Sequence, residues 1–125
     1  MTKKDQSFHD YVVGDLLGNI DGITSRAMFG GWGIYRDGNI FAIIIEGELY
    51  FKVDDTNRVD FERLGSHPFV YMQGKQKLTM SYWLLPVEVQ EDREQLSLFV
   101  ARAVAVSKQI KSIKGKNFNA KKTGK

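Results

Sequence analysis

The spacing of hydrophobic residues predicts a helix near the start of the chain. Five apolar residues between positions 4 and 18 fall near one helical face. They are Phe8, Tyr11, Val12, Leu16 and Leu17. The turn pairs Gly18-Asn19 and Asp21-Gly22 follow this segment and end it. Residues 4–18 are therefore expected to form an amphipathic helix.

From residue 23 to residue 54 the pattern becomes that of β-strands. Asp37-Gly38 is a hairpin signal, because Asp-Gly readily adopts the two positive φ angles of a type I′ turn, and Glu46-Gly47 marks the next turn. The residues between these turns, 40–45, are all apolar, which is typical of a central strand covered on both faces. We therefore expect an antiparallel meander with this strand near its middle.

The strand after Glu46-Gly47 alternates between its two faces. One face carries Leu49, Phe51 and Val53, and the other carries Tyr50 and Lys52. A second hairpin is expected further along, with strands at 69–72 and 78–84 around a turn at 73–75. In its second strand Leu78, Met80, Tyr82 and Leu84 share one face, while Thr79, Ser81 and Trp83 share the other.

Two further helices are predicted in the second half of the chain. Residues 57–64 form a short helix that offers Val59, Phe61 and Leu64 for packing and ends at Gly65. Asp92 and Gln95 resemble a capping box at the start of the main helix. An apolar stripe follows at spacings of three and four, which we interpret as a helix laid on the sheet, since two heptads are too few for a coiled coil. The stripe is Leu96, Phe99, Ala103, Val106 and Ile110.

These elements predict one α+β domain at residues 1–110. Its antiparallel sheet has five or six strands, with helices at the N-terminus, in the middle and at the C-terminus. Residues 111–125 are predicted to be a basic, disordered tail. No stretch approaches the roughly 18 consecutive apolar residues of a membrane span, and the polar N-terminus lacks the apolar core of a signal peptide. With no cysteine in its 125 residues, the chain is expected in the cytoplasm.

The positive charge is concentrated in the tail. Residues 108–125 carry seven lysines and no acid, so the remaining 11 basic residues face 15 acidic ones, a net of −4. A lysine run can attract phosphates, but this one has no arginine and a single aromatic, Phe118. We favour a solvated terminus. Any nucleic-acid binding is expected to be weak and nonspecific. The candidate residues are Lys111, Lys114, Lys116, Lys121, Lys122 and Lys125.

Residues that could carry chemistry are few. His9 is expected on a polar helix face and His67 in a loop, and no second ligand lies at zinc spacing from either. A Ser–His–Asp group could be assembled from Ser25 or Ser81, but without geometry such a triple has no weight. Asp54-Asp55 is best interpreted as a helix cap. We therefore expect no enzyme activity, no metal and no cofactor.

Glycines and aromatic residues dominate the strands. The cluster Gly30-Gly31-Trp32-Gly33 lies between two strands and has no helix start behind it, so a bulge or close backbone contact is favoured over a phosphate loop. Aromatic residues beside Arg26, Arg36 and Lys52 could stack bases, but these basic residues are too few, and we prefer a core plus a subunit interface. The aromatics are Trp32, Tyr35, Phe41, Tyr50, Phe69, Tyr71, Tyr82 and Trp83.

The segment 24–35, TSRAMFGGWGIY, resembles the N-terminal domain of the TfoX/Sxy family of competence regulators. The similarity continues at 41–44, 49–54, 69–71 and 80–86 and covers about residues 8–110. The motif residues, either structural or interacting, are Ser25, Arg26, Met28, Phe29, Gly30, Gly31, Gly33, Tyr35, Tyr50, Lys52, Tyr82 and Trp83. The resemblance implies a two-layer fold like that of secretion chaperones and supplies no catalytic residues. Longer members are transcription coactivators whose second domain would be missing here.

These considerations leave three hypotheses. The first is a non-enzymatic regulatory or adaptor domain of TfoX type that acts through protein contacts, has a transcription regulator as its partner, and forms a homodimer. The second is a nucleic-acid-binding module that uses the lysine tail and the aromatic sheet face. The third, which we favour least, is an enzyme or small-molecule binder that uses a pocket near Arg26, Tyr50 and Lys52. The homodimer is expected because the apolar run 40–45 needs cover on two faces and the helix at 57–64 is too small to supply one of them.

Overall fold

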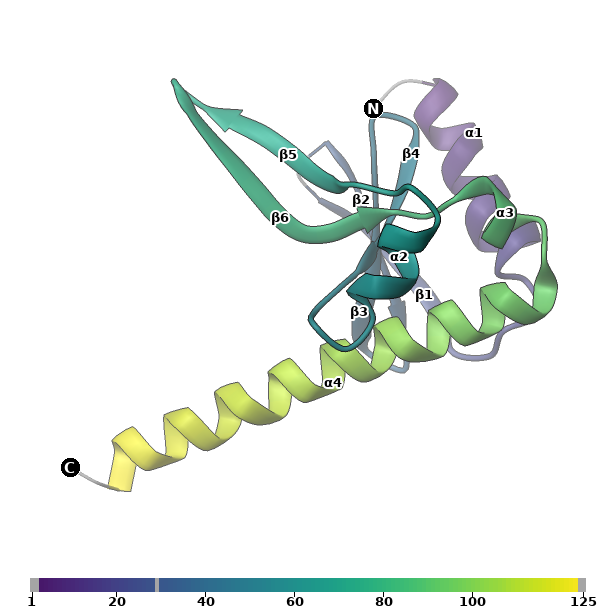
Figure 1. Cartoon of the computed structure of the whole chain (residues 1–125). Coiled ribbons are helices and arrows are strands. Elements are labelled where there is room, and N and C mark those ends of the chain that lie inside the picture. The colour runs from purple at the N-terminus through teal and green to yellow at the C-terminus, as the bar shows by residue number, and fades with distance from the viewer. Residues whose placement is uncertain (1–2, 29, 124–125) are drawn as a thin grey trace.

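The computed structural model of the chain describes residues 3–28 and 30–123, with side chains at 6–28 and 30–111. Six strands form one sheet in the order β1-β2-β3-β4-β6-β5, and all neighbours are antiparallel (Figure 1). The strands are β1 (Ile23–Met28), β2 (Gly31–Arg36), β3 (Asn39–Ile45), β4 (Glu48–Lys52), β5 (Pro68–Gln73) and β6 (Gln76–Leu84). The helices are α1 (Lys3–Tyr11), the π-helix η1 (Val12–Leu16), α2 (Arg58–Arg63), α3 (Val87–Gln90) and α4 (Arg93–Thr123). The predicted α+β fold is confirmed.

The turns of the meander form where the sequence predicts them. Asp37 and Gly38 have φ angles of 50° and 82°, and Glu46 and Gly47 have φ angles of 53° and 75°. Two successive positive φ values define a type I′ turn, whose twist matches that of the flanking strands. Because both connections are this short, β2, β3 and β4 must pair in sequence order. The strand at 40–45 therefore lies inside the sheet as expected.

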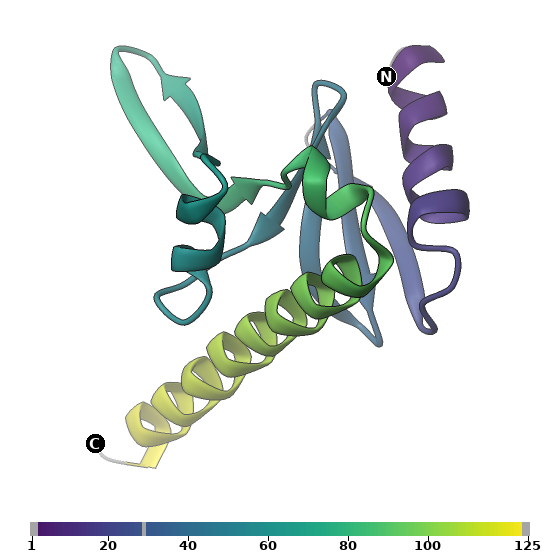
Figure 2. The same ribbon diagram turned by 45° about the vertical axis from the view of Figure 1, so that its right-hand side comes forward.

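All helices whose packing is described lie on one face of the sheet, which we call the helix side. Helix α4 crosses β3 and β4 and buries the predicted stripe against them, except for Ile110, which is half-buried (Figure 2). Edge-to-face ring pairs stabilise each layer: Phe41 of β3 and Phe51 of β4 lie 5.4 Å apart within the sheet, and Phe61 of α2 lies 5.1 Å from Phe99 of α4 in the helix layer. The same core holds Val12 and Leu17 from the first helical segment and Val89 from α3. Within the described part of the chain, no helix covers the opposite face, although the run at 40–45 predicted cover on both.

The first helix differs from the prediction in its second half. The residues after Tyr11 form a π-helical turn, in which the Leu17 amide donates to the carbonyl oxygen of Val12 at 2.9 Å. A bond over five residues places Val12 and Leu17 above one another, and both are fully buried. Tyr11 was expected on the same apolar face but is 42% exposed, because the wider turn rotates it outward.

Helix α2 ends as predicted but packs through fewer residues. Gly65 has φ +76°, and the amides of Gly65 and Ser66 donate to the carbonyl oxygens of Glu62 and Phe61, which is a Schellman motif. Phe61 is buried in the core. Val59, expected to pack beside it, is 47% exposed, because a six-residue helix presents only one narrow face to its neighbours.

Helix α4 begins at the predicted cap and continues beyond the predicted domain. The Asp92 carboxylate accepts hydrogen bonds from the backbone amides of Glu94 and Gln95, at 3.1 and 3.2 Å. The side chain of Gln95 donates to the other carboxylate oxygen at 3.1 Å. The helix extends through the lysine-rich segment to Thr123, where the sequence pattern predicts a disordered tail. Disorder of this segment in solution stays a prediction.

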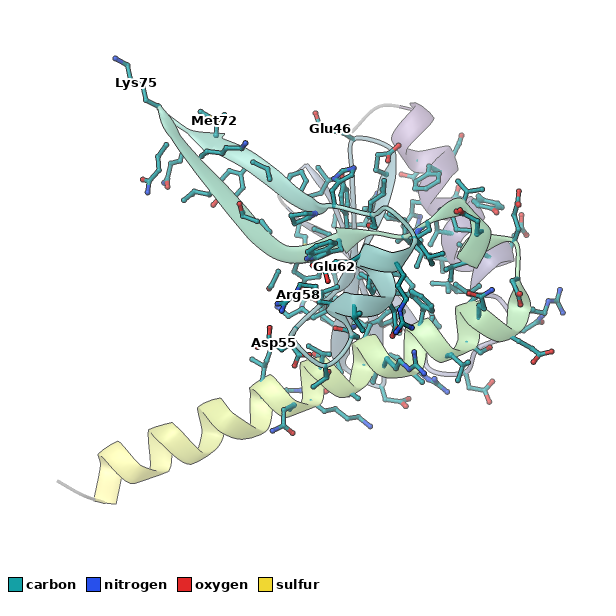
Figure 3. The ribbon with its side chains drawn as sticks, in the orientation of Figure 1. Glu46, Asp55, Arg58, Glu62, Met72 and Lys75 are labelled. Atoms are coloured by element: carbon teal, nitrogen blue, oxygen red, sulfur yellow. The ribbon has the colours of Figure 1, made fainter. Side chains whose placement is uncertain are left out.

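The hairpin formed by β5 and β6 projects from the body of the molecule (Figures 1 and 2). Strand β6 pairs with β4 only from Tyr82 to Leu84, and its remaining residues pair with β5 alone. We call residues 69–80 the arm. In Figure 3 the side chains of Met72 and Lys75 stand at its outer end, far from Arg58 and Glu62 on α2. The arm therefore exposes both of its faces over much of its length.

Candidate functional site

The face of the sheet opposite the helices, here called the open face, gathers most of the predicted motif residues. Residues directly paired across antiparallel strands point to the same face. The register joins Arg26 to Gly33, Gly33 to Ile43, Ile43 to Tyr50 and Tyr50 to Leu84, which makes one row across five strands. Around this row lies an apolar cluster that is separate from the main core. It comprises Ile40, Ile43, Ile45, Tyr50, Phe69, Met80, Tyr82 and Leu84.

Two hollows open on this face. One, of about 190 Å³, lies among Met28, Ile40, Ile43, Ile45, Met80 and Tyr82, with Trp32 at its wall. The other, of about 470 Å³, lies where the arm leaves the sheet and is lined by Ile45, Phe69, Tyr71 and Met80. Ring contacts link body and arm, since Phe69 lies 5.2 Å from Tyr50 and 6.2 Å from Tyr71. The open face and the inner side of the arm therefore form one continuous apolar surface.

Tyr50 and Tyr82 of this surface stay neutral at physiological pH. Burial raises the pKa of Tyr82 to about 12, with a smaller contribution from Tyr35. The pKa of Tyr50 is also raised, first by burial and then by the charges of Glu48 and Glu46. Lys52 lies with its Nζ 4.7 Å from the centre of the Tyr82 ring and donates to the Ser81 hydroxyl at 3.2 Å.

The glycines of the motif have structural reasons to be glycine. A Cβ on Gly31 would lie 2.0 Å from the carbonyl oxygen of Ile44 in the neighbouring strand. A Cβ on Gly33 would lie 2.7 Å from the Met28 sulfur. Gly30 has φ +76° and open space around it, so its backbone conformation rather than its surroundings favours glycine. Phe29, also predicted as a motif residue, lies outside the described residues.

Ser25, His9 and Asp10 form a hydrogen-bonded chain that the sequence pattern did not support. His9 Nε2 lies 2.8 Å from the Ser25 hydroxyl, and His9 Nδ1 lies 2.9 Å from Asp10 Oδ1. The imidazole stacks on the Trp32 ring with centroids 3.8 Å apart. His9 was expected on a polar helix face, but its side chain is only 12% exposed, because α1 lies over β1 and β2. The geometry is that of a nucleophile, a base and an orienting acid.

The surroundings of Ser25, His9 and Asp10 favour a structural role for this hydrogen-bonded group. Asp10 is 66% exposed, and its pKa is lowered first by the hydrogen bond to His9 and then by that from Gln6. Ser25 points to the helix side, so neither hollow of the open face reaches it. A reactive serine needs space for a substrate and donors for an oxyanion beside its hydroxyl. We interpret the hydrogen bonds of Ser25, His9 and Asp10 as the contact that holds α1 on the sheet.

The remaining predicted residues separate between the two faces. Arg26, Met28, Tyr35, Tyr50, Lys52 and Tyr82 lie on the open face. Trp83 lies on the helix side, 6.5 Å from the Phe61 ring. The predicted site residues do not include Ile45, Met80 or Tyr71, although the alternation in 78–84 already placed Met80 beside Tyr82.

Of the tail lysines, Lys111 is described and donates to Asn39 Oδ1 at 3.4 Å. The side chains of Lys114, Lys116, Lys121 and Lys122 lie outside the described residues, as does Lys125. Within the part of the chain that the structure covers, no group of three or more His, Asp or Glu side chains is placed to hold a metal ion. In the same part, no helix has the length and apolar character needed to cross a membrane.

Comparison with known families agrees with the resemblance in the motif. The family model of the TfoX N-terminal domain matches residues 15–107. The chain belongs to the TfoX N-terminal domain family. The matched region holds all six strands, the open face and the part of α4 that packs on the sheet. The lysines beyond residue 107 lie outside the TfoX N-terminal domain match. No curated protein matches the chain.

Proposed function

We propose that this TfoX N-terminal domain is a non-enzymatic regulatory adaptor that acts through protein contacts and forms a homodimer through the open face. The observation that carries this proposal is the apolar open face together with the arm that projects beside it. Tyr71, which lines the hollow between arm and sheet, is 41% exposed. A contiguous apolar surface of this kind on a folded domain usually marks a protein-binding site.

The arm supports a second copy as the occupant of the open face. A two-stranded ribbon alone in water is marginally stable, so the arm gains stability when another surface covers it. A two-fold pair uses the same surfaces on both subunits, and each arm can then lie on the open face of the other copy. The hollow between arm and sheet, about 470 Å³, offers room for apolar side chains of the partner.

Charges on the two surfaces are complementary. The arm carries Lys75 and Lys77 and no acid between residues 68 and 81. The turn between β3 and β4 carries Glu46 and Glu48, whose charges act on Tyr50 of the open face. In an exchanged pair the basic arm of one copy can approach the acidic turn of the other. Such complementarity fixes the orientation of two surfaces more than it adds affinity.

The regulatory part of the proposal rests on family membership. Longer relatives act with a transcription regulator, and a protein of that class is the partner we propose for this chain. The dimer leaves the outer surface of α4 and α2 accessible for it. Asp60 and Arg102 form an ion pair of 2.7 Å there, and Leu98 is 53% exposed nearby on α4.

Light scattering coupled to size exclusion tests the dimer. We expect the wild-type chain to have about twice its mass of 14.3 kDa at micromolar concentration. Tyr71→Asp places a charge in the proposed interface and should give a monomer with an unchanged circular dichroism spectrum. Val87→Asp is the matched control, because Val87 is 60% exposed on α3, far from the open face. A mass of 14.3 kDa for the wild type at every concentration would refute the dimer.

A pull-down with nuclease treatment tests the adaptor role. Wild type, Tyr71→Asp and Leu98→Asp are used as baits in parallel. We expect a transcription-regulator protein to remain bound after nuclease and to be lost with Leu98→Asp. If the transcription regulator stays bound to all three baits, or is released by nuclease, the proposed protein contact through the outer surface of α4 is wrong.

A further inference from the structure

A third hollow, of about 320 Å³, lies where α4 passes the start of β3. Five parts of the chain contribute to it: β2, the turn at Gly38, β3, β4 and α4. Its polar lining consists of Tyr35, Asn39, Lys52, Ser107 and Lys111. Ile40 and Ile110 form its apolar wall. The site described above does not include this hollow.

The polar groups of this hollow are held in place. Asn39 donates from Nδ2 to the carbonyl oxygens of Arg36 and Asp37, at 3.3 and 3.2 Å, which fixes its side chain in the turn. Its Oδ1 accepts a hydrogen bond from Lys111 at 3.4 Å. Lys52 is anchored on the other side by the Ser81 hydroxyl and the Tyr82 ring. Two ammonium groups from separate elements therefore reach one cavity.

Burial sets this cavity apart from an ordinary basic surface. Among the residues whose burial is described, only three polar ones are buried: Asn39, Asn57 and Ser107. Asn57 lies away from this hollow, in the loop before α2, where it bonds backbone atoms of Asp54 and Lys52. The other two, each 8% exposed, both line this hollow. Two buried polar side chains beside the ammonium groups of Lys52 and Lys111 are typical of a binding site rather than of two solvated lysines.

The cavity also lacks a carboxylate. None of the residues that line it, all of them described, is Asp or Glu. Asp37 is adjacent in the turn, but its Oδ1 points at Gly22, where an added Cβ would lie 2.2 Å away. The pKa of Tyr82 beneath Lys52 is raised to about 12, so this phenol adds no negative charge. The local field therefore favours an anion.

We propose that this hollow binds a small phosphomonoester, such as a nucleoside monophosphate. A phosphomonoester carries about 1.5 to 2 negative charges near pH 7 and three strong acceptor oxygens, which matches two ammonium groups and neighbouring hydroxyls. The Tyr35 ring and the two isoleucines provide a surface for a planar organic group. The cavity volume of about 320 Å³ is near the lower end of the range for small-molecule sites, so the ligand that fits it has one phosphate and a compact substituent.

Titration of the full chain, followed by amide NMR shifts, tests this proposal with AMP, adenosine and inorganic phosphate as probes. AMP should produce saturable shifts at Asn39 and Ser107, phosphate should bind more weakly at the same amides, and adenosine should produce none. Lys111→Gln should weaken AMP binding at least tenfold. Lys108→Gln is the matched control, because Lys108 is exposed on the same helix and outside the lining, and it should change affinity less than twofold.

Three results would overturn the proposal. Shifts that stay linear to high AMP concentration would mean that no site exists. If Lys111→Gln and Lys108→Gln weaken AMP binding equally and have equal melting temperatures, AMP is attracted by the general positive charge of the surface rather than by this cavity. A single-stranded oligonucleotide that binds far more tightly than AMP, and equally through Lys108 and Lys111, would assign the basic surface to a nucleic-acid strand instead.

Discussion

Replacing Gly31 by alanine is expected to destabilise the chain through a backbone collision. The new Cβ would lie 2.0 Å from the carbonyl oxygen and 3.1 Å from the carbonyl carbon of Ile44, whereas real Cβ contacts stay beyond 3.0 Å. Both atoms belong to the main chain of β3, so no side chain can rotate away. Strands β2 and β3 must separate by about 1 Å, which strains the packing and weakens neighbouring hydrogen bonds. We expect a loss of about 2–4 kcal/mol in unfolding free energy.

Urea denaturation followed by circular dichroism measures this loss, and the melting temperature should fall by about 10 °C. Two alanine variants separate the collision from other effects of losing a glycine. Gly30→Ala meets nothing within 4 Å but keeps φ +76°, and should cost about 1 kcal/mol from backbone strain alone. Gly14→Ala has open space and no positive φ, so stability should be unchanged or rise by up to about 1 kcal/mol. A Gly31→Ala chain as stable as the Gly30→Ala chain would refute the collision.

Three further outcomes are expected. The pKa of Asp92 is lowered, first by the hydrogen bond from the Gln95 side chain, so its cap contributes fully to stability above the ordinary pKa of 3.8, and this contribution is lost as the pH falls through the lower pKa of the folded state. Asp92→Ala should therefore reduce the melting temperature at pH 7, and this reduction should shrink as the pH is lowered below 3.8. His9→Ala and Ser25→Ala should lower the melting temperature, while ester hydrolysis stays at background in wild type and variants; activity lost with Ser25 would contradict the structural role. Removing residues 111–125 should leave the fold intact, because the buried core ends before them. If the chain binds duplex DNA, this deletion should abolish the binding, whose logarithmic salt slope is about 0.9 per phosphate neutralised. Sequence-specific binding that survives this deletion would be incompatible with an electrostatic tail.

Several features followed from the sequence because short-range rules control them. The turn at Asp37-Gly38, the helix end at Gly65 and the cap at Asp92 depend on the φ preference of one residue or on hydrogen bonds a few residues apart. The alternation in β4 likewise separates Tyr50 and Lys52 from Phe51, and the structure keeps this separation. Such signals are local, so they predicted element types and most boundaries.

The exceptions arise where one element meets another. The π-helical turn that exposes Tyr11 forms because Val12 and Leu17 both reach the core, which no periodicity in residues 4–18 requires. Val59 was expected to pack, but α2 contacts α4 through Phe61 and through the ion pair of Asp60 with Arg102. His9 appeared polar and is packed on Trp32, a residue 23 positions later in the sequence.

The amino-acid sequence by itself determined the α+β class, the meander and the family, because propensity, turn chemistry and a contiguous motif are read along the chain. Only the tertiary structure decided that α2, α3 and α4 pack on one face together with the first helical segment, which leaves the other face open. An apolar stripe predicts that one face of a helix packs on another element, but it does not predict on which face of the sheet the helix lies. The same reason applies to the cation pair Lys52 and Lys111, which are distant in sequence and meet only because α4 crosses the start of β3.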